Sequence, residues 1–168
     1  MSNQVLFENK YDFDDKSLKK YVKTITKGSR ISALFVTVAG VIFAIMEYRN
    51  NSKIFSAVLG GIAIVGLLAY FITVPRTLKN IRNQENILSE KIIQITFNHM
   101  NIFENNKERK VKFGEIVSVL EDDESMYLMV DKTKGVIIKK SGFTKGTFEE
   151  FKKFIDKKFI RQQPTTGG

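Results

Sequence analysis

The sequence predicts an α+β membrane protein in which a two-helix transmembrane hairpin accompanies a small antiparallel β-barrel or sheet capped by a C-terminal helix. Two uncharged apolar stretches, at residues 31–46 and 54–74, predict the hairpin. Short segments of alternating apolar and polar residues predict the strands. A final apolar stripe at helical spacing predicts the last helix.

The second apolar stretch is long enough to cross a bilayer, because its residues at about 1.5 Å each cover the roughly 30 Å hydrocarbon core. The first is shorter and needs Arg30 and Glu47 at the interfaces. The predicted spans are therefore residues 31–48 and 54–74. A buried hairpin of a soluble protein is one alternative, but a chain of 168 residues is too small to enclose it. A cleaved signal peptide would begin closer to the N-terminus.

Basic residues predict the orientation of the hairpin, since they concentrate on the cytoplasmic side of membrane helices. Those before the first span are Lys16, Lys19, Lys20, Lys23, Lys27 and Arg30, and those after the second are Arg76, Lys79 and Arg82. The connecting loop carries Arg49 and Lys53. We therefore expect a multi-pass plasma-membrane protein with both termini in the cytoplasm, and the lack of Cys fits a reducing compartment.

Residues 1–30 are expected to form a cytoplasmic segment with a short strand near residues 4–11 and a juxtamembrane amphipathic helix. Asp14 or Asp15 fits the N-cap position of that helix. Its apolar residues are Leu18, Tyr21, Val22 and Ile25, with lysines around the remaining circumference. Such a helix can lie at the membrane interface or bind a partner.

Small residues at four-residue spacing within the spans predict a close approach of helix backbones. They are Gly40 and Ala44 in the first span, and Ser56, Ala57, Gly60 and Gly61 in the second. The pattern is typical of packing within the hairpin and also of dimerisation. A transport path would need ionisable or polar groups at mid-depth, and the spans offer only Thr37, Ser56 and Tyr70 within them or near their ends, so we do not interpret the hairpin as a transporter.

After the hairpin we expect a helical connector at residues 75–90, a cytoplasmic domain at residues 91–161 and a flexible tail at residues 162–168. The domain begins with alternating apolar residues, and we expect a turn at residues 98–101. Further strands are expected at residues 102–106, 111–120, 126–130 and 136–139, joined as an antiparallel meander.

The final helix is expected to begin after Thr147, which fits its N-cap position. Its acidic residues come first and its lysines last, as the helix dipole favours. Its apolar residues are Phe148, Phe151, Phe154, Ile155 and Phe159. We interpret this stripe as core, in preference to a ligand pocket.

Five residues carry a family resemblance: Phe113, Ile116, Tyr127, Lys140 and Phe143. With the order of elements, they make the chain resemble the YcxB-like membrane proteins, whose C-terminal domain is similar to bacterial pleckstrin-homology (PH) domains. Phe113 stands where the family usually has Trp, and Lys139 where it tends to have Pro. The resemblance implies a PH-like fold and a membrane location, and it implies no reaction.

The sequence offers no recognisable catalytic or metal-binding motif, so we expect no catalysis, no cofactor and no metal. The single histidine, His99, has no Cys or second His as a fellow ligand and is expected in a solvated turn. The four acids at residues 121–124 lack the spacing of a calcium loop and are expected at a hairpin tip.

Two functional hypotheses remain, and both include two membrane spans in a bilayer. In the first, the domain binds a protein partner or a second copy through a sheet edge or a groove beside the last helix. In the second, it binds anionic lipid headgroups. The candidate basic residues are Lys107, Arg109, Lys110 and Lys112, with Lys132, Lys134, Lys139 and Lys140. Although the net charge is +9, the interspersed acids argue against nucleic acid as a partner.

Overall fold

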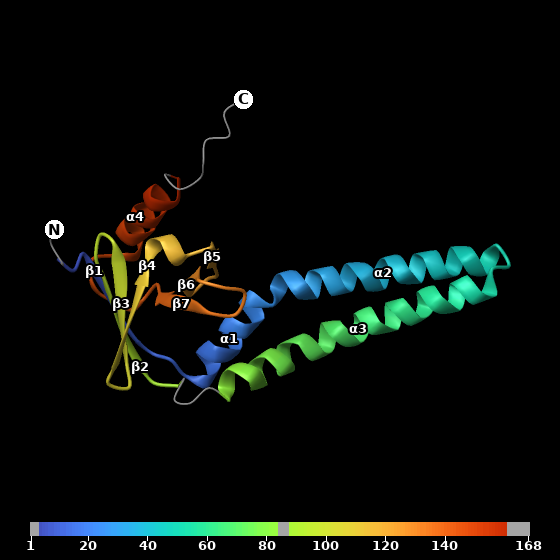
Figure 1. The fold of residues 1–168 in the computed structure, drawn as a ribbon, viewed down its shortest axis with the longest axis horizontal. Coiled ribbons are helices and arrows are strands. Elements are labelled where there is room, and N and C mark those ends of the chain that lie inside the picture. The colour runs from blue at the N-terminus through green and yellow to red at the C-terminus, as the bar shows by residue number, and fades with distance from the viewer. Residues whose placement is uncertain (1–3, 84–87, 161–168) are drawn as a thin grey trace, which may run out of the picture. The chain divides into compact units, whose positions relative to one another are not determined.

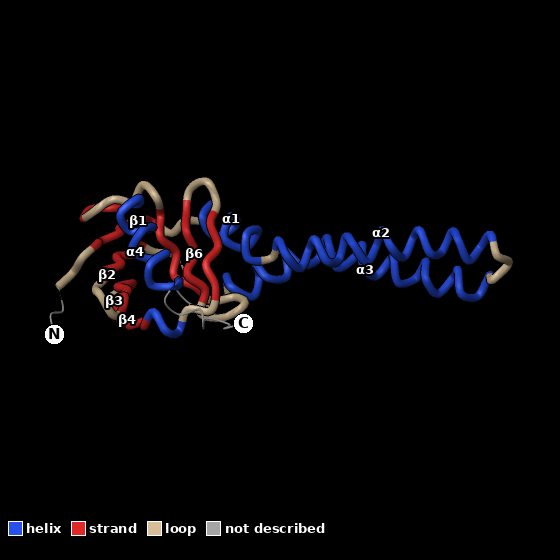
Figure 2. The backbone as a smooth tube through the Cα atoms, turned by 90° about the horizontal axis from the view of Figure 1, so that it is seen from above, coloured by secondary structure: helices blue, strands red, loops and turns tan. Residues whose placement is uncertain are grey.

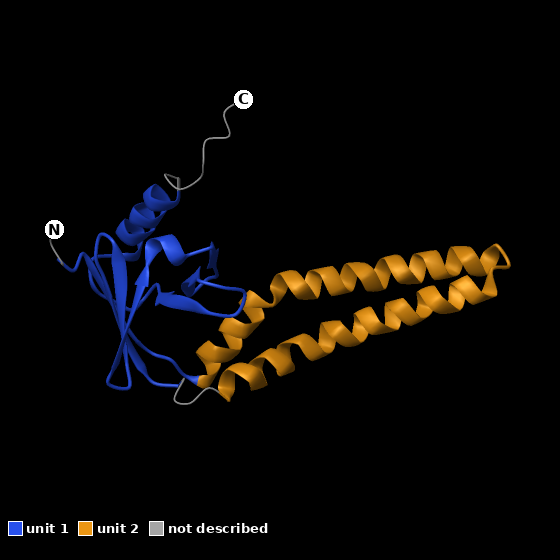
Figure 3. Ribbon diagram, viewed as in Figure 1, with its two compact units in different colours: residues 1–14, 88–168 blue, residues 15–87 orange. Residues whose placement is uncertain are grey.

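The computed structural model describes residues 4–83 and 88–160, and the chain divides into two compact units (Figure 3). The helical unit comprises residues 15–87, whereas the second unit combines residues 1–14 with residues 88–168. The helical unit is thus an insertion within the chain of the other. The predicted tail, and residues 84–87 of the predicted connector, lie outside the described residues.

Three helices build the helical unit: α1 (Asp15–Ile25), α2 (Lys27–Arg49) and α3 (Lys53–Arg82) (Figure 1). The two predicted spans lie within α2 and α3, which contact each other as a hairpin. Each of these helices is long and apolar enough to cross a membrane. Pro75 lies inside α3, so this helix continues past its apolar stretch, as the sequence predicts.

Close contact between α2 and α3 depends on small residues. A Cβ atom added to Gly40 would lie 3.1 Å from the Cβ of Ala63, so the two backbones approach closely there. Near the loop end of the hairpin, the Ser56 hydroxyl donates a hydrogen bond of 2.8 Å to the carbonyl oxygen of Ala44. These contacts confirm hairpin packing through Gly40, Ala44 and Ser56.

A second close approach involves a residue that the sequence analysis did not single out. A Cβ atom at Gly66 would lie 2.7 Å from Oγ1 of Thr37. The predicted Gly60 and Gly61 instead have open space where a Cβ atom would lie. The four-residue spacing therefore identified the right helices, but Gly60 and Gly61 make no close approach within the hairpin.

The amphipathic pattern of α1 is present in the structure. Leu18 and Val22 are fully buried and Tyr21 is 5% exposed, whereas Lys16, Lys19 and Lys23 are exposed. Arg82 of α3 forms an ion pair with Asp15 at the start of α1. The face of α1 that the sequence predicts to be apolar is therefore buried.

The second unit contains eight strands, a short 3₁₀ helix and one α-helix among its described residues. These elements are β1 (Phe7–Asp12), β2 (Glu90–Ile95), β3 (His99–Glu104), β4 (Lys107–Lys112), η1 (Phe113–Glu115), β5 (Ser118–Glu121), β6 (Ser125–Met129), β7 (Gly135–Lys139), β8 (Phe143–Lys145) and α4 (Phe148–Ile160).

These strands form two antiparallel sheets in place of one continuous meander (Figure 2). The larger sheet has the order β4-β3-β2-β1-β8, and the smaller has the order β5-β6-β7. The strand pairs within the described residues do not close a barrel. The structure therefore supports the sheet in the predicted fold class and not the closed barrel.

The N-terminal strand β1 lies inside the larger sheet, a pairing that the sequence analysis did not decide. It pairs with β2 on one side, where Phe7 faces Ile95, and with β8 on the other. The side chain of Asn9, fully buried, also reaches β7: its Nδ2 donates to the Lys139 carbonyl oxygen at 2.7 Å, and its Oδ1 accepts from the Lys139 N–H at 3.1 Å. Asn9 therefore joins the larger sheet to a strand of the smaller one.

One local prediction, near the start of β3, is wrong, and one strand was not predicted. Residues 99–101, expected in a turn, form the first half of β3, and β8 was not predicted as a strand. The expected end of the second strand at Asn105 and Asn106 is confirmed, because both residues adopt positive φ angles, 47° and 59°, in the β3–β4 turn.

Helix α4 packs its apolar residues on the larger sheet. Phe151 is fully buried and Ile155 is 2% exposed, while the Phe7 ring lies 5.7 Å from Phe151 in an edge-on arrangement. The predicted cap is confirmed: the Glu150 N–H donates to Oγ1 of Thr147 at 3.3 Å, and the Thr147 N–H donates to a Glu150 carboxylate oxygen at 3.0 Å. The core interpretation of the stripe is confirmed for Phe151 and Ile155.

Candidate functional site

Strand β4 is an edge of the larger sheet, because it pairs with β3 alone among the described strands. The turn at Asn105 and Asn106 fixes its register, with Met100 opposite Val111. An edge strand leaves backbone N–H and C=O groups available to another extended chain. The first predicted basic cluster therefore lies along an open hydrogen-bonding edge.

The four basic residues of β4 are all exposed, and we call them the basic edge: Lys107, Arg109, Lys110 and Lys112. Side chains alternate along a strand, so the first two share one face with the buried Val111 and the last two share the other. In the part of the chain that the structure describes, no carboxylate forms an ion pair with any of the four. The four cations thus lie along one edge strand, two on each face of the sheet.

The second predicted basic cluster does not form a single surface. Lys132 and Lys134 lie in the turn before β7, whereas Lys139 and Lys140 lie at its far end, about 17 Å away at 3.3 Å per residue. Hydrogen bonds from the backbone N–H of Thr133 lower the pKa of Asp131, which shapes this turn. The structure separates the cluster into two pairs.

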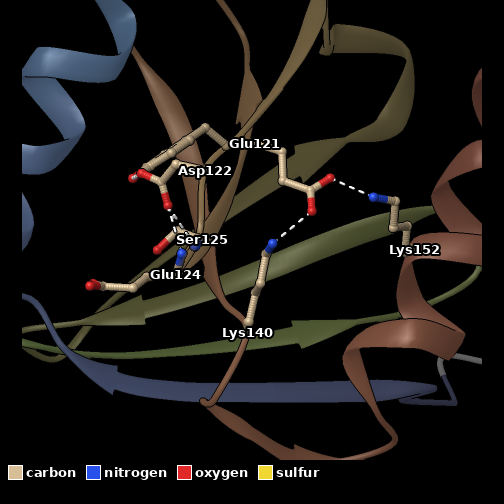
Figure 4. Close-up of polar contacts among 7 residues, drawn as sticks. Glu121, Asp122, Glu124, Ser125, Lys140 and Lys152 are labelled. Carbon is tan, nitrogen blue, oxygen red and sulfur yellow. Dashed lines mark hydrogen bonds and ion pairs between the residues drawn. The ribbon is translucent and has the colours of Figure 1, made fainter.

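Lys140 is held in an ion-pair network (Figure 4). Its Nζ lies 2.7 Å from one carboxylate oxygen of Glu121, and Nζ of Lys152 lies 2.6 Å from the other. Hydrogen bonds from Lys140 and then Lys152 lower the pKa of Glu121. The network links β5, the segment after β7 and α4, so Lys140 has a stabilising partner within its own unit.

The acidic turn before β6 is organised by Asp122, whose Oδ1 accepts hydrogen bonds of 2.9 Å from the N–H groups of Glu124 and Ser125 (Figure 4). Its Oδ2 accepts a 2.6 Å hydrogen bond from the Tyr127 hydroxyl. Asp122 therefore forms the turn. Among residues 4–83 and 88–160, no three His, Cys, Asp or Glu side chains gather as ligands for a metal ion.

His99 is buried, and the prediction of a solvated turn residue is wrong. It begins β3, its side chain is enclosed so that 8% of the residue is exposed, and its Nδ1 lies 3.2 Å from Oγ1 of Thr96. Burial, reinforced by the Lys110 cation, lowers the pKa of His99, and the Glu108 carboxylate opposes that shift. Strand pairing with β4, which a local reading of residues 98–101 does not reveal, accounts for the error.

Three phenylalanine rings surround the ammonium group of Lys158 on α4. Its Nζ lies 3.7 Å from the ring centroid of Phe97, 5.3 Å from that of Phe113 and 5.5 Å from that of Phe154. It also donates a hydrogen bond to the carbonyl oxygen of Phe97. Spacing could have indicated only the Phe154–Lys158 contact, because these residues are four apart on one helix whereas the other rings are distant in sequence.

The chain was compared with models of known protein families. Residues 95–155 match the YcxB-like protein family. The match confirms the resemblance, and it begins at the end of β2 and reaches into α4. No curated protein and no solved structure matches the chain.

Within the matched residues 95–155, each of the five residues that carry the resemblance is buried or contacts another side chain of its unit. Phe113, Ile116 and Tyr127 are buried. The ring of Phe143 lies 5.6 Å from that of Phe151, and Lys140 has the ion pair described above. Strand β1 lies outside the matched residues, although it pairs with two strands of the same sheet.

Proposed function

We propose that this chain is a two-span protein of the plasma membrane that presents a non-catalytic, PH-like binding module to a protein partner in the cytoplasm. The single observation that carries the partner proposal is the basic edge, four exposed cations bordering an edge strand. The YcxB-like match and the two apolar helices support the membrane proposal.

The exposed side chains of the hairpin support its insertion into a bilayer. Phe35 is 76% exposed, Ile54 81% and Phe71 65%. Burying one such side chain away from water contributes about 1.5–3 kcal/mol, so a hairpin with many of them is far more stable in hydrocarbon than in water. A lipid environment accounts for these apolar surfaces.

Cysteine labelling tests both insertion and orientation, because the chain has no native Cys. A cysteine introduced at Asn51, in the exposed α2–α3 loop, should react with a membrane-impermeant thiol reagent in intact cells. One introduced at the exposed Thr133 should react only after the cells are permeabilised. Labelling of Thr133→Cys in intact cells, with protection of Asn51→Cys, would reverse the orientation.

The geometry of the basic edge favours an extended acidic segment of a protein over a flat lipid surface. Because its side chains alternate, only two of the four cations lie on either face of the sheet. An added strand would pass all four cations and use the free backbone groups of β4. Its acidic side chains would be attracted to the cations of the edge. This attraction favours fast association and fixes the register of the added strand.

Photo-crosslinking of the full-length protein in cells tests this assignment. We expect a crosslinker at the exposed Glu108 to capture an acidic segment of one protein. Reversing the basic edge (Lys107→Glu, Arg109→Glu, Lys110→Glu, Lys112→Glu) should lower the yield by about tenfold or more, because like charges oppose each other.

The matched control reverses four other exposed lysines, at Lys132, Lys134, Lys153 and Lys157, which gives the same change in net charge. We expect it to keep the adduct. An equal loss of the adduct in both variants would mean that net charge, and not the basic edge, determines the yield. If the adducts contained only anionic lipid, the result would contradict a protein partner and support binding of lipid headgroups.

A further inference from the structure

We propose that the rings of Phe97, Phe113 and Phe154, with the carbonyl oxygen of Phe97, form an ammonium-binding cup for a small primary amine such as ethanolamine. In the unliganded chain, the side chain of Lys158 occupies this cup. The proposal rests on contacts that do not involve the basic edge.

The geometry of the cup matches the chemistry of an ammonium ion. The negative faces of aromatic rings attract a cation within about 6 Å of their centroids, and the Lys158 ammonium lies within that range of all three. The rings also pack on each other, with the Phe154 centroid 5.5 Å from Phe113 and 6.3 Å from Phe97. Their mutual contacts hold the cup in shape.

The carbonyl oxygen of Phe97 selects the kind of amine. It accepts a hydrogen bond from Nζ of Lys158, so the occupant must carry an N–H group. A primary ammonium supplies both the charge and the donor, whereas a quaternary ammonium supplies the charge alone. We therefore expect ethanolammonium to bind more tightly than tetramethylammonium.

The open side of the cup and the position of Lys158 near the end of α4 allow another ammonium group to replace it. Phe113 is 3% exposed and forms the inner wall, whereas Phe97 is 58% exposed, so the cup is open to solvent on one side. Lys158 belongs to the last turn of α4, beyond residues 95–155 that match the family and contain all three rings. A flexible lysine side chain regains rotamer freedom when it leaves, which lowers the cost of exchange.

The test follows the side chain of Lys158 by NMR in the full-length protein, in a maltoside detergent that contains no amine. Ring currents should shift the Hε signals of Lys158 away from those of other lysines. Ethanolammonium chloride should return these signals toward ordinary lysine positions, whereas sodium chloride at equal ionic strength should not. Signals that stay fixed both in this titration and with the lipid source of the amine described below would overturn the proposal.

Two substitutions add an independent readout on labelled phenylalanine rings. Lys158→Ala should bind ethanolammonium about tenfold more tightly than the unsubstituted chain, because the internal competitor is gone. Lys157→Ala, on the neighbouring exposed residue, should bind like the unsubstituted chain. Adding Phe97→Leu to Lys158→Ala should abolish the gain, and retention of the gain would exclude the cup.

The source of the amine is distinguished with bilayer nanodiscs that contain ethanolamine lipids. A response to these nanodiscs together with a response to free ethanolammonium would support a site for small amines. A response to the nanodiscs alone would support the same cup with a lipid headgroup as its ligand. No response to either would overturn the proposal.

Discussion

Replacing Phe151 with alanine should lower the free energy of unfolding by about 3–5 kcal/mol, the usual loss for a phenylalanine removed from a packed core. The Phe151 side chain is fully buried and its ring lies 5.7 Å from that of Phe7 and 5.6 Å from that of Phe143. These partners come from β1 and β8, so the substitution removes contacts between α4 and both strands. The measurement is chemical denaturation of the full-length protein in detergent, monitored by circular dichroism.

The control for this prediction is Phe148→Ala, on the same helix. Phe148 is half-buried and its ring lies 6.3 Å from that of Phe143. Phe148→Ala should therefore lower the free energy of unfolding by much less than Phe151→Ala. Equal losses for the two variants would contradict the central position assigned to Phe151.

Replacing Asn9 with leucine, which has a similar volume, should lower the free energy of unfolding by about 2–4 kcal/mol. The substitution leaves the N–H and C=O groups of Lys139 without the Asn9 amide, and an unpaired buried polar group costs about 1–3 kcal/mol. The Lys139 amide proton should also exchange faster with solvent. Hydrogen exchange measured by NMR, together with denaturation, checks both effects.

Gln94→Leu is the matched control for Asn9→Leu. Gln94 also connects two strands, through a 3.0 Å hydrogen bond from its Nε2 to Glu8, but both residues are half-buried. Water can replace that bond, so its loss should cost less than about 1 kcal/mol. If Gln94→Leu were as destabilising as Asn9→Leu, this result would contradict the stabilising role assigned to the buried hydrogen bonds of Asn9.

Features set by nearby residues were the ones that the sequence predicted well. The hairpin follows from two uncharged stretches, and the start of α4 follows from Thr147 and Glu150, which are three residues apart. The turn at Asn105 and Asn106 likewise needs residues that tolerate positive φ. Each signal is contained within a short segment.

Features set by distant pairing could not be predicted in the same way. Strand β8 has three residues and follows from its partner β1, while the burial of His99 follows from its place in the sheet. The basic residues of the candidate site were visible in the sequence. The ion pair that occupies Lys140, and the absence of one along the basic edge among the described residues, depend on folding.

The pairing of β1 with β2 constrains how the polypeptide can thread through a bilayer. β1 precedes the hairpin and β2 follows it, yet Tyr11 and Lys91 are neighbours across one ladder. Two strands that share hydrogen bonds must occupy the same aqueous compartment, so the chain between them can cross a membrane only an even number of times. The sheet also stays incomplete during synthesis until the whole hairpin has been made, because β1 gains its partner β2 only afterwards.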